Sequence, residues 1–410
     1  MKDRKTTSYR LLTWLTNGLA YTVLTLFALV MIFPFLYMFS TSFKYQTDTF
    51  RYPPRLMPYQ QLASKIPGQD IPAPLYYVTT NGEKREYVLV ETNIPAGIFA
   101  PVDAPDQTFI LPLSSAQPLL DANGDQQSAA VNGETRSLWV VPVNGEPRTL
   151  AQVGQTALGR FVDPENPQES VYQNVRLSEP VETIAIRPEN YREVTELHGL
   201  DRSLTNTALV TILVVVGQLV TSVVGGYAFA RLRFPGRDRL FVFYLGTIMI
   251  PFVVLITPLY QLMVAIGWVD KMAALIIPWV FTAYGTFLMR QFFITIPKEI
   301  EEAALIDGAS RLQILWRIFL PASVPALATQ ATFTFLYAWN SFFWPLVIIN
   351  TGNRENHVLT LALSMLRGRA SDNPNLVLAG AAISILPPMI IYILAQRFFV
   401  ESAVSSGVKG

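Results

Sequence analysis

One polar stretch, residues 297–321, has residue types and spacing suited to docking against a partner rather than to catalysis. Its sequence predicts a short helix, followed by a glycine and a second, amphipathic segment. Lys298 with Glu302, and Asp307 with Arg311, are spaced as i,i+4 ion pairs on an exposed helix face. Such a face predicts a recognition surface; the alternative is an ordinary cytosolic amphipathic helix between two membrane spans.

Small residues complete this stretch. Ala303 and Ala304 leave one side of the predicted helix nearly bare, so a partner can approach it closely. Gly308 permits a backbone reversal that a residue with a Cβ atom would resist. Pro297 suits the first helical turn. After the glycine, an apolar stripe at helical spacing predicts a second helix; its residues are Ile314, Leu315, Ile318 and Phe319.

The rest of the chain offers little for covalent or metal chemistry. It has no cysteine, which excludes disulfides, thiolate metal sites and thiol catalysis. Its two histidines, His198 and His357, are far apart, which is more typical of surface residues than of ligands. No G-x-x-x-x-G-K-[S/T] phosphate loop is present, so this chain is not expected to hydrolyse ATP. We predict no catalytic residue, no metal ligand and no enzyme activity.

Composition and hydropathy predict an all-α membrane protein. The chain is 51% hydrophobic and 15% charged, against roughly 25% charged in soluble domains. Its net charge of +1 gives no sign of a nucleic-acid partner. Six stretches are long and apolar enough to cross a bilayer. The first is too long for a signal-peptide core and no small-residue cleavage site follows it, so it is expected to be retained. The six lie near 14–40, 204–230, 240–266, 272–292, 323–349 and 376–399.

Lysine and arginine are unevenly distributed beside these spans. They cluster before the first span, after the second, around residues 297–321 and after the last span. The positive-inside rule therefore places both termini, and the 297–321 loop, in the cytoplasm.

The spans contain essentially no ionisable residue away from their ends. Ion-coupled carriers usually keep one at depth, so the energy for any transport is expected to come from elsewhere. The polar groups present are neutral, and in the fifth span they alternate with aromatic rings, a combination that suits a sugar. The same groups could instead join helices by hydrogen bonds, and both interpretations stay open. The candidate pathway residues are Gln330, Thr332, Tyr337, Trp339 and Asn340.

The spacing of the 297–321 stretch resembles the EAA loop of permease subunits of bacterial ABC importers at every signature position. Three further segments resemble the carbohydrate-uptake branch of that family, typified by the smaller maltose permease subunit. They are Tyr227–Gly236, Ala338–Leu346 and Ala395–Val400. The resemblance covers about residues 1–58 and 186–410.

This resemblance implies the type I ABC importer fold, with six transmembrane helices in the bacterial cytoplasmic (inner) membrane. It also implies a homologous second permease subunit, two ATPase subunits that bind ATP and Mg, and an extracytoplasmic solute-binding protein. The chain itself would bind no cofactor. ATPase coupling would rest on Glu302, Ala303, Ala304, Asp307 and Gly308, with an ATPase-contacting tail of Gly407, Val408, Lys409 and Gly410. The implied solute is a sugar or oligosaccharide; a non-sugar solute such as glycerol phosphate, or an ATP-independent carrier, is the alternative.

Residues 59–185 depart from the family pattern. Short runs rich in Val, Tyr, Ile and Trp are separated by Asn-Gly pairs, the strongest local signal for hairpins. We predict three parts: residues 1–44 with the first span, an extracytoplasmic β-rich insert over 45–202, and the core permease over 203–410. The insert either caps the external gate or helps to dock a binding protein, or it is a tolerated insertion without a role.

Overall fold

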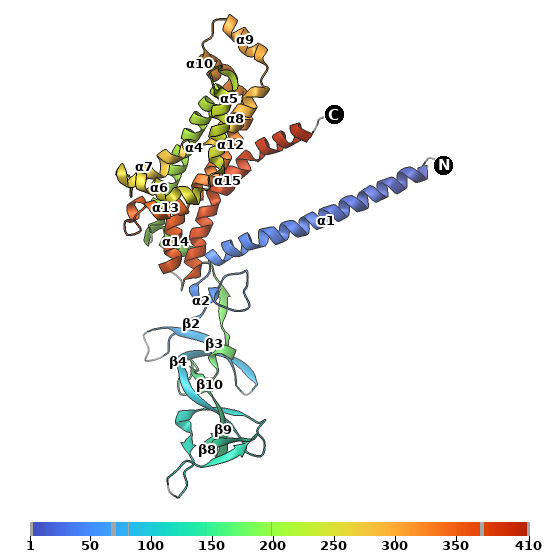
Figure 1. Ribbon diagram of the computed structural model, residues 1–410. Helices are drawn as coiled ribbons and strands as arrows, with labels where there is room; N and C mark the ends of the chain where they lie inside the picture. The colour runs from blue at the N-terminus through green and yellow to red at the C-terminus, as the bar shows by residue number, and fades with distance from the viewer. Residues whose placement is uncertain are drawn as a thin grey trace. The chain divides into compact units, whose positions relative to one another are not determined.

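The computed structural model describes residues 3–66, 71–80, 82–122, 124–143, 145–197, 199–369 and 373–407. The chain divides into two units, one formed by Met1–Leu56 with Arg187–Gly410 and the other by Met57–Ile186. The first is helical and the second is built of strands (Figure 1). The predicted combination of a helical unit with a β-rich unit is therefore confirmed.

The helical unit contains α1 (Asp3–Ser42), α2 (Gln46–Thr49), α3 (Glu189–Arg192), α4 (Leu200–Arg231), α5 (Arg237–Gly246), α6 (Phe252–Ala265), α7 (Met272–Ile276), α8 (Ala283–Thr295), α9 (Lys298–Ile306), α10 (Arg311–Ile314), α11 (Leu320–Ala322), α12 (Val324–Trp339), α13 (Phe343–Ile348), α14 (Leu359–Arg369) and α15 (Pro374–Gly407). Four helical segments among the described residues are long and apolar enough to cross a membrane: Leu12–Ser42, Leu200–Arg231, Met272–Thr295 and Pro374–Arg397. Two bent pairs are further candidates, and six spans result if each pair counts as one.

The bent pairs differ from the continuous spans that hydropathy predicts. Segments Arg237–Met249 and Phe252–Ala265 meet at 98°, and the break contains Pro251, which has no backbone N–H to continue a helix. The second pair, Arg311–Ala322 and Val324–Trp339, meets at 79°. The predicted span 323–349 has a separate interruption, because α12 ends at Trp339 and the chain resumes as α13. Pro345 cannot donate to the carbonyl of Ser341, which instead accepts the Thr360 hydroxyl at 2.6 Å. Hydropathy averages over such breaks and so misses them.

Helices α4, α8 and α12 lie side by side (Figure 1). Small residues allow this close approach. A Cβ atom on Gly226 of α4 would lie 2.6 Å from the Cβ of Met289 in α8. One on Gly285 would lie 2.3 Å from both the Gln330 amide nitrogen and the Ser222 hydroxyl. Membrane helices commonly pack through small residues in this way, so these glycines set the distance between the three helices.

The end of α1 is fastened to the segment that follows the β-rich unit. The side-chain amide of Asn190 donates to the carbonyls of Ser42 at 2.8 Å and Lys44 at 2.9 Å, and it is fully buried. The Tyr191 hydroxyl lies 2.7 Å from that of Ser42. Because of these bonds, residues 45–56 and 187–202 group with the helical unit, although sequence analysis assigned them to the insert.

The β-rich unit contains β1 (Tyr59–Gln61), β2 (Ala63–Ser64), β3 (Ala73–Thr80), β4 (Glu83–Ala100), β5 (Phe109–Pro112), β6 (Gln117–Pro118), β7 (Ser128–Val131), β8 (Glu134–Val143), β9 (Glu146–Val162), β10 (Ser170–Gln173), β11 (Glu179–Pro180) and β12 (Glu182–Ile184). The main sheet has the order β11-β3-β4-β9-β8-β6, and its neighbouring strands run antiparallel. The long strands β4 and β9 pair with each other along most of their length.

Two-residue turns join β3 to β4, β7 to β8 and β8 to β9, as the Asn-Gly pairs predict. At the middle turn both Asn132 and Gly133 have positive φ, 51° and 82°, as a type I′ turn requires. Asn81, Asn123 and Asn144 lie outside the described residues.

Apolar clusters lie along both ends of the β4–β9 pair. One end buries Val78, Tyr87 and Phe161, and the other buries Phe99, Val141 and Leu150. Tyr87 is fully buried and donates a hydrogen bond to Glu169 Oε1 at 2.8 Å. Burial raises the pKa of the Tyr87 hydroxyl. The unit therefore contains its own core.

Candidate functional site

The docking helix predicted from sequence is α9, Lys298–Ile306. It ends in a turn in which the backbone N–H of Gly308 donates to the Leu305 carbonyl at 3.1 Å and that of Ala309 to the Ala304 carbonyl at 2.9 Å. Gly308 has φ +83°, a conformation that other residues adopt only with strain. The second helix, α10, starts at a capping box between Ser310 and Gln313. The predicted helix, glycine turn and second helix are all present.

The ion pairs predicted for this loop do not form among the described residues. Instead of pairing with Asp307, Arg311 reaches across the turn to Glu301 Oε1. Glu302 and Asp307 are exposed. The i,i+4 rule assumes an isolated helix, whereas here the chain folds back at Gly308 and presents Arg311 to the inner face of α9.

The inner face of α9 carries Glu301 and Ala304, one helical turn apart. Ala304 packs against the cluster of Phe293, Ile314 and Phe319. Glu301 is buried although it is a carboxylate, and it also lies 3.5 Å from Arg231 Nη1, at the end of α4. Sequence reasoning missed this pair because it placed Ala304, three residues from Glu301, on the partner-facing side of the helix.

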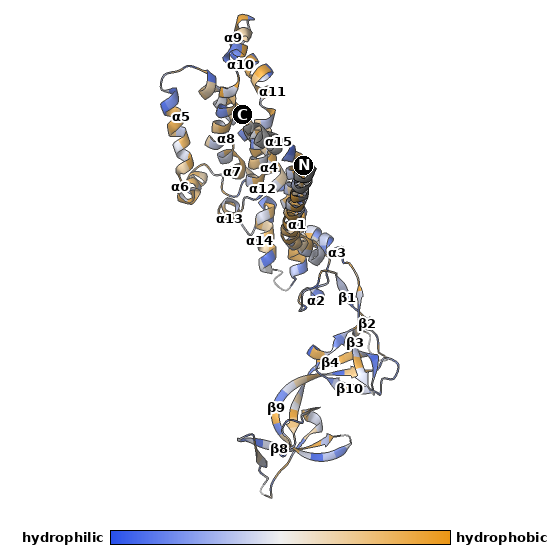
Figure 2. Ribbon diagram, turned by 90° about the vertical axis from the view of Figure 1, so that its right-hand side faces the viewer, coloured by the Kyte–Doolittle hydropathy of each residue, from blue (hydrophilic) through white to orange (hydrophobic). Residues whose placement is uncertain are grey.

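The outer face of α9 combines acids with exposed apolar side chains. Ile306 is 86% exposed. Ala303 and Gly308 are exposed next to it. In Figure 2 the helix shows both hydrophilic and hydrophobic residues. The further exposed apolar residues of the loop are Ile300, Leu305, Leu312 and Trp316. A surface of this composition can bind a groove on another protein.

A polar network joins α4 to α12 and to the segment that precedes α8. The Gln218 amide donates to the Trp279 carbonyl at 2.7 Å and accepts from the Thr334 hydroxyl at 2.7 Å. The Gln330 amide donates to the Ser222 hydroxyl at 2.7 Å. All four of these side chains are buried. Gln330 of α12 therefore forms a hydrogen bond to α4.

The other candidate pathway residues differ in exposure and in their hydrogen-bond partners. Thr332 is buried and donates to the carbonyl of Ala328 in its own helix at 2.8 Å. Trp339 is buried with its indole N–H on the Ser384 carbonyl at 3.0 Å. Tyr337 and Asn340 are exposed.

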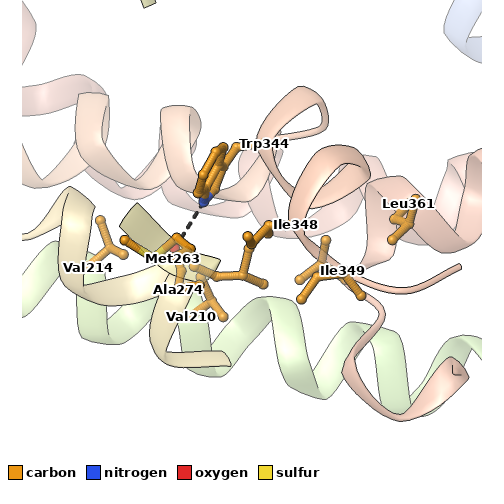
Figure 3. Close-up of a cluster of buried hydrophobic side chains, with 10 residues drawn as sticks. Val210, Val214, Met263, Ala274, Trp344, Ile348, Ile349 and Leu361 are labelled. Carbon is orange, nitrogen blue, oxygen red and sulfur yellow. Dashed lines mark hydrogen bonds between the residues drawn. The ribbon is translucent and has the colours of Figure 1, made fainter. Parts of the chain in front are cut away.

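Tyr337 and Trp339 share the lining of one cavity with Trp279 and Trp344. Its free space is about 20 Å³, which holds roughly one water molecule. An apolar cluster shares Val210, Val214 and Trp344 with this lining. In it the Trp344 indole donates to the Ala274 carbonyl at 2.9 Å (Figure 3). This aromatic cavity is therefore too small for a sugar, which needs a pocket of a few hundred Å³.

Three remaining predictions concern the tail and the histidines. Gly407 ends α15, and Val408, Lys409 and Gly410 lie outside the described residues, as does His198. His357 is buried rather than at the surface, and its Nε2 lies 3.3 Å from the Asn350 carbonyl oxygen. No group of side chains in the described residues could hold a metal ion.

Residues 219–403 match the family of binding-protein-dependent transport system inner membrane components. An arabinooligosaccharides transport system permease protein of Halalkalibacterium halodurans, AraQ, is 37% identical over 207 residues, which cover 50% of this chain and 73% of the relative. The sn-glycerol-3-phosphate transport system permease protein UgpE of Rhizobium meliloti is 36% identical and is covered to 80%. The chain belongs to this family of ABC importer permeases.

Solved structures are also similar. A chain of a bacterial ABC transporter involved in the import of the acidic polysaccharide alginate shares 29% identity with a TM-score of 0.47, over 52% of this chain and 80% of that one. The β-rich unit, Met57–Ile186, lies outside the residues that match the family model.

Proposed function

We propose that this chain is the transmembrane subunit of an ATP-driven importer that takes up a sugar or oligosaccharide. It would pair with a second, homologous permease, two ATPase subunits that bind ATP and Mg, and an external solute-binding protein, in a bacterial inner membrane. The observation that carries the proposal is α9: a short helix between membrane helices whose outer face is apolar and acidic and whose inner face is fixed to the permease.

In this proposal α9 binds a groove of the ATPase. Glu302 supplies a polar contact, Ala303 permits close packing, and Asp307 with Gly308 forms the turn at the end of the contact. Ala304 faces the permease core, so its part is to hold α9 in place. Closure of the ATPase dimer on ATP would move α9 and turn the membrane helices from inward- to outward-facing.

A neutral solute is supported by the charge distribution. In the described spans, ionisable side chains lie near the ends, as Arg231, Arg290 and Arg397 do. Neutral amides, hydroxyls and aromatic rings occupy the interior. The relative named for arabinooligosaccharides fits this chemistry. The relatives named for sn-glycerol-3-phosphate support an anionic solute as the second candidate.

The β-rich unit lies between the first two spans in the sequence, which suggests a place near the external gate. It would cap that gate or help to dock the binding protein. Deleting residues 60–185 tests this role, because unchanged uptake and unchanged binding-protein affinity would leave the unit as a tolerated insertion.

The first test is mild solubilisation of the tagged protein from its native membrane, followed by identification of stoichiometric partners. We expect an ATPase with a phosphate-binding loop and a second permease. The binding protein that accompanies them is then screened with neutral oligosaccharides and with glycerol phosphate to decide between the two solutes. Purification of the chain alone under every mild condition would refute the importer and favour a carrier that needs no ATPase.

A further inference from the structure

The guanidinium of Arg231 joins three helices at one point. Arg231 is the last residue of α4, and its Nη2 donates to the Phe293 carbonyl of α8 at 2.6 Å and to the Ile296 carbonyl just beyond α8. Its Nη1 lies 3.5 Å from Glu301 Oε2 in α9. The guanidinium also lies over the Phe319 ring, 5.0 Å from its centre.

These charges are removed from water. The side chains of Arg231 and Glu301 are only 4% and 8% exposed. Burying a charged pair is expensive, and an apolar pair of similar volume often stabilises a protein as well or better. Bidentate and charge-assisted hydrogen bonds, however, fix direction as well as distance. An apolar contact at this point would let α9 slide or rotate over α4, whereas the guanidinium bonds resist both movements.

The α4 helix continues this connection into the membrane. Two of its side chains, Gln218 and Ser222, bond to Thr334 and Gln330 of α12. Tyr337 follows on α12 one turn beyond Thr334 and lines the aromatic cavity. A displacement of α9 therefore reaches the cavity through two sets of directional bonds, at Arg231 and at Gln218.

We propose that Arg231 and Glu301 are positioning residues that make α9, α4 and α8 move as one body, so that movement of α9 opens and closes the aromatic cavity. This inference rests on the proposed function, since it assigns how ATPase movement reaches the membrane helices. Arg311, which is half-exposed on the other side of Glu301, orients the carboxylate.

The test uses the complete complex reconstituted in liposomes with its binding protein. Glu301→Gln keeps the size of the side chain and removes its charge. Arg231→Lys keeps a charge but cannot supply the planar fork that reaches two carbonyls and a carboxylate. Arg202→Gln is the matched control, because it breaks an exposed ion pair with Glu355 far from α9 in the sequence. The readout is solute transported per ATP hydrolysed, measured only on fully assembled complexes.

We expect transport per ATP to fall by about 2- to 30-fold in both variants, the range found for residues that carry coupling between sites. The double variant should lose little more than the worse single one, because the two residues act through one contact. Arg202→Gln should keep the wild-type ratio. A lower yield of complex with an unchanged ratio would overturn the inference and leave the pair as a stability contact.

A second measurement follows the movement itself. The chain has no cysteine, so spin labels can be placed at Val224 on α4 and Glu299 on α9, both exposed. The distance between them should stay constant with and without ATP in the wild-type complex and should broaden in Glu301→Gln. A wild-type distance that changes with ATP would overturn the inference. A wild-type complex without ATPase subunits or uptake would instead refute the proposed function itself.

Discussion

The β-rich unit and α9 bury opposite kinds of side chain. In the β-rich unit Val78, Tyr87 and Phe99 are fully buried, and ion pairs such as Lys84–Glu179 lie at the surface. In α9 the carboxylate of Glu301 is inside and Ile306 is outside. The burial pattern of the β-rich unit is typical of a domain with its own hydrophobic core, in which surface ion pairs contribute little to stability. The burial pattern of α9 is unfavourable for a helix exposed to water, and we expect a partner protein to cover its apolar outer face.

The two regions should also respond differently to substitution. A substitution in the β-rich core should lower stability without changing how ATP hydrolysis is coupled to uptake. A substitution on the outer face of α9 should change this coupling without lowering stability. Pairs of matched substitutions can therefore test whether the two regions differ as their burial patterns indicate.

The largest effect is expected from Phe99→Ala. Phe99 is fully buried between Val141 and Leu150, and truncation of a buried phenylalanine costs about 3–5 kcal/mol. Hydrogen exchange of the full-length chain should show faster exchange in β4, β8 and β9, with α9 unchanged. The exposed Leu120 provides the control, because Leu120→Ala should leave exchange as it is. Protection of β8 and β9 that survives Phe99→Ala would show that this cluster is not the core.

Ile306→Ala should give the next largest effect, on binding instead of stability. Its side chain is 86% exposed, so its loss should not lower the melting temperature of the isolated chain. Burying an isoleucine in a partner contributes about 1.5–3 kcal/mol, and association with the ATPase should weaken accordingly. Leu177 of the β-rich unit is 83% exposed, and Leu177→Ala is the matched control. Equal ATPase affinity for the two variants would remove the docking role of Ile306.

Gly308 offers a smaller and more specific test. A Cβ atom there would touch nothing, so a substitution acts only through φ +83°. The left-handed conformation costs a residue with a Cβ atom about 1–2 kcal/mol. Gly308→Val should therefore uncouple ATP hydrolysis from uptake without preventing membrane insertion. Gly308→Asp should uncouple as well, because it adds a negative charge to an acidic surface.

Two further variants make this test conclusive. Gly308→Asn should keep most of the uptake, since asparagine tolerates the left-handed region. Gly236→Val should keep coupling, because Gly236 has φ +76° and open space but lies outside the α9 loop. Normal uptake by Gly308→Val would show that the turn at the end of α9 is dispensable.

The sequence predicted the outer face of α9 more successfully than the inner one. The helix and the glycine turn follow from local spacing, although the two predicted ion pairs do not form and Ala304 packs against the permease core instead of lying on the outer face. Glu301 and Arg231 are 70 positions apart, and no local pattern relates a carboxylate in a polar loop to an arginine at the end of a span. The bends in the two bent helix pairs were not predicted for a related reason. Hydropathy measures how apolar a segment is, and it does not show where the backbone hydrogen bonds of a helix stop.

The candidate pathway residues show the same limit. Neutral polar side chains can line a solute route or join helices by hydrogen bonds, and the same residue types serve both roles. Only the partners of Gln330 distinguish them, because its amide bonds to Ser222 and not to an open space. The strands of the insert were easier to predict, since Asn-Gly turns fix the register of adjacent strands locally.

The smallest effect is expected from Tyr87→Phe, and it tests the β-rich core by pH. Removing the hydroxyl deletes the bond to Glu169 and should cost about 1 kcal/mol at neutral pH. Burial raises the pKa of Tyr87 above its ordinary value, so the folded unit holds the neutral phenol while the unfolded chain ionises at about pH 10. The contribution of Tyr87 to stability is therefore complete below pH 10 and is lost as pH rises further.

Hydrogen exchange in β4 should accelerate above pH 10 by more than its intrinsic increase with pH, and this extra acceleration should be smaller in Tyr87→Phe than in the wild type. The same pH response in both chains would mean that Tyr87 is accessible to water. The β-rich unit would then differ less from α9 in what it buries.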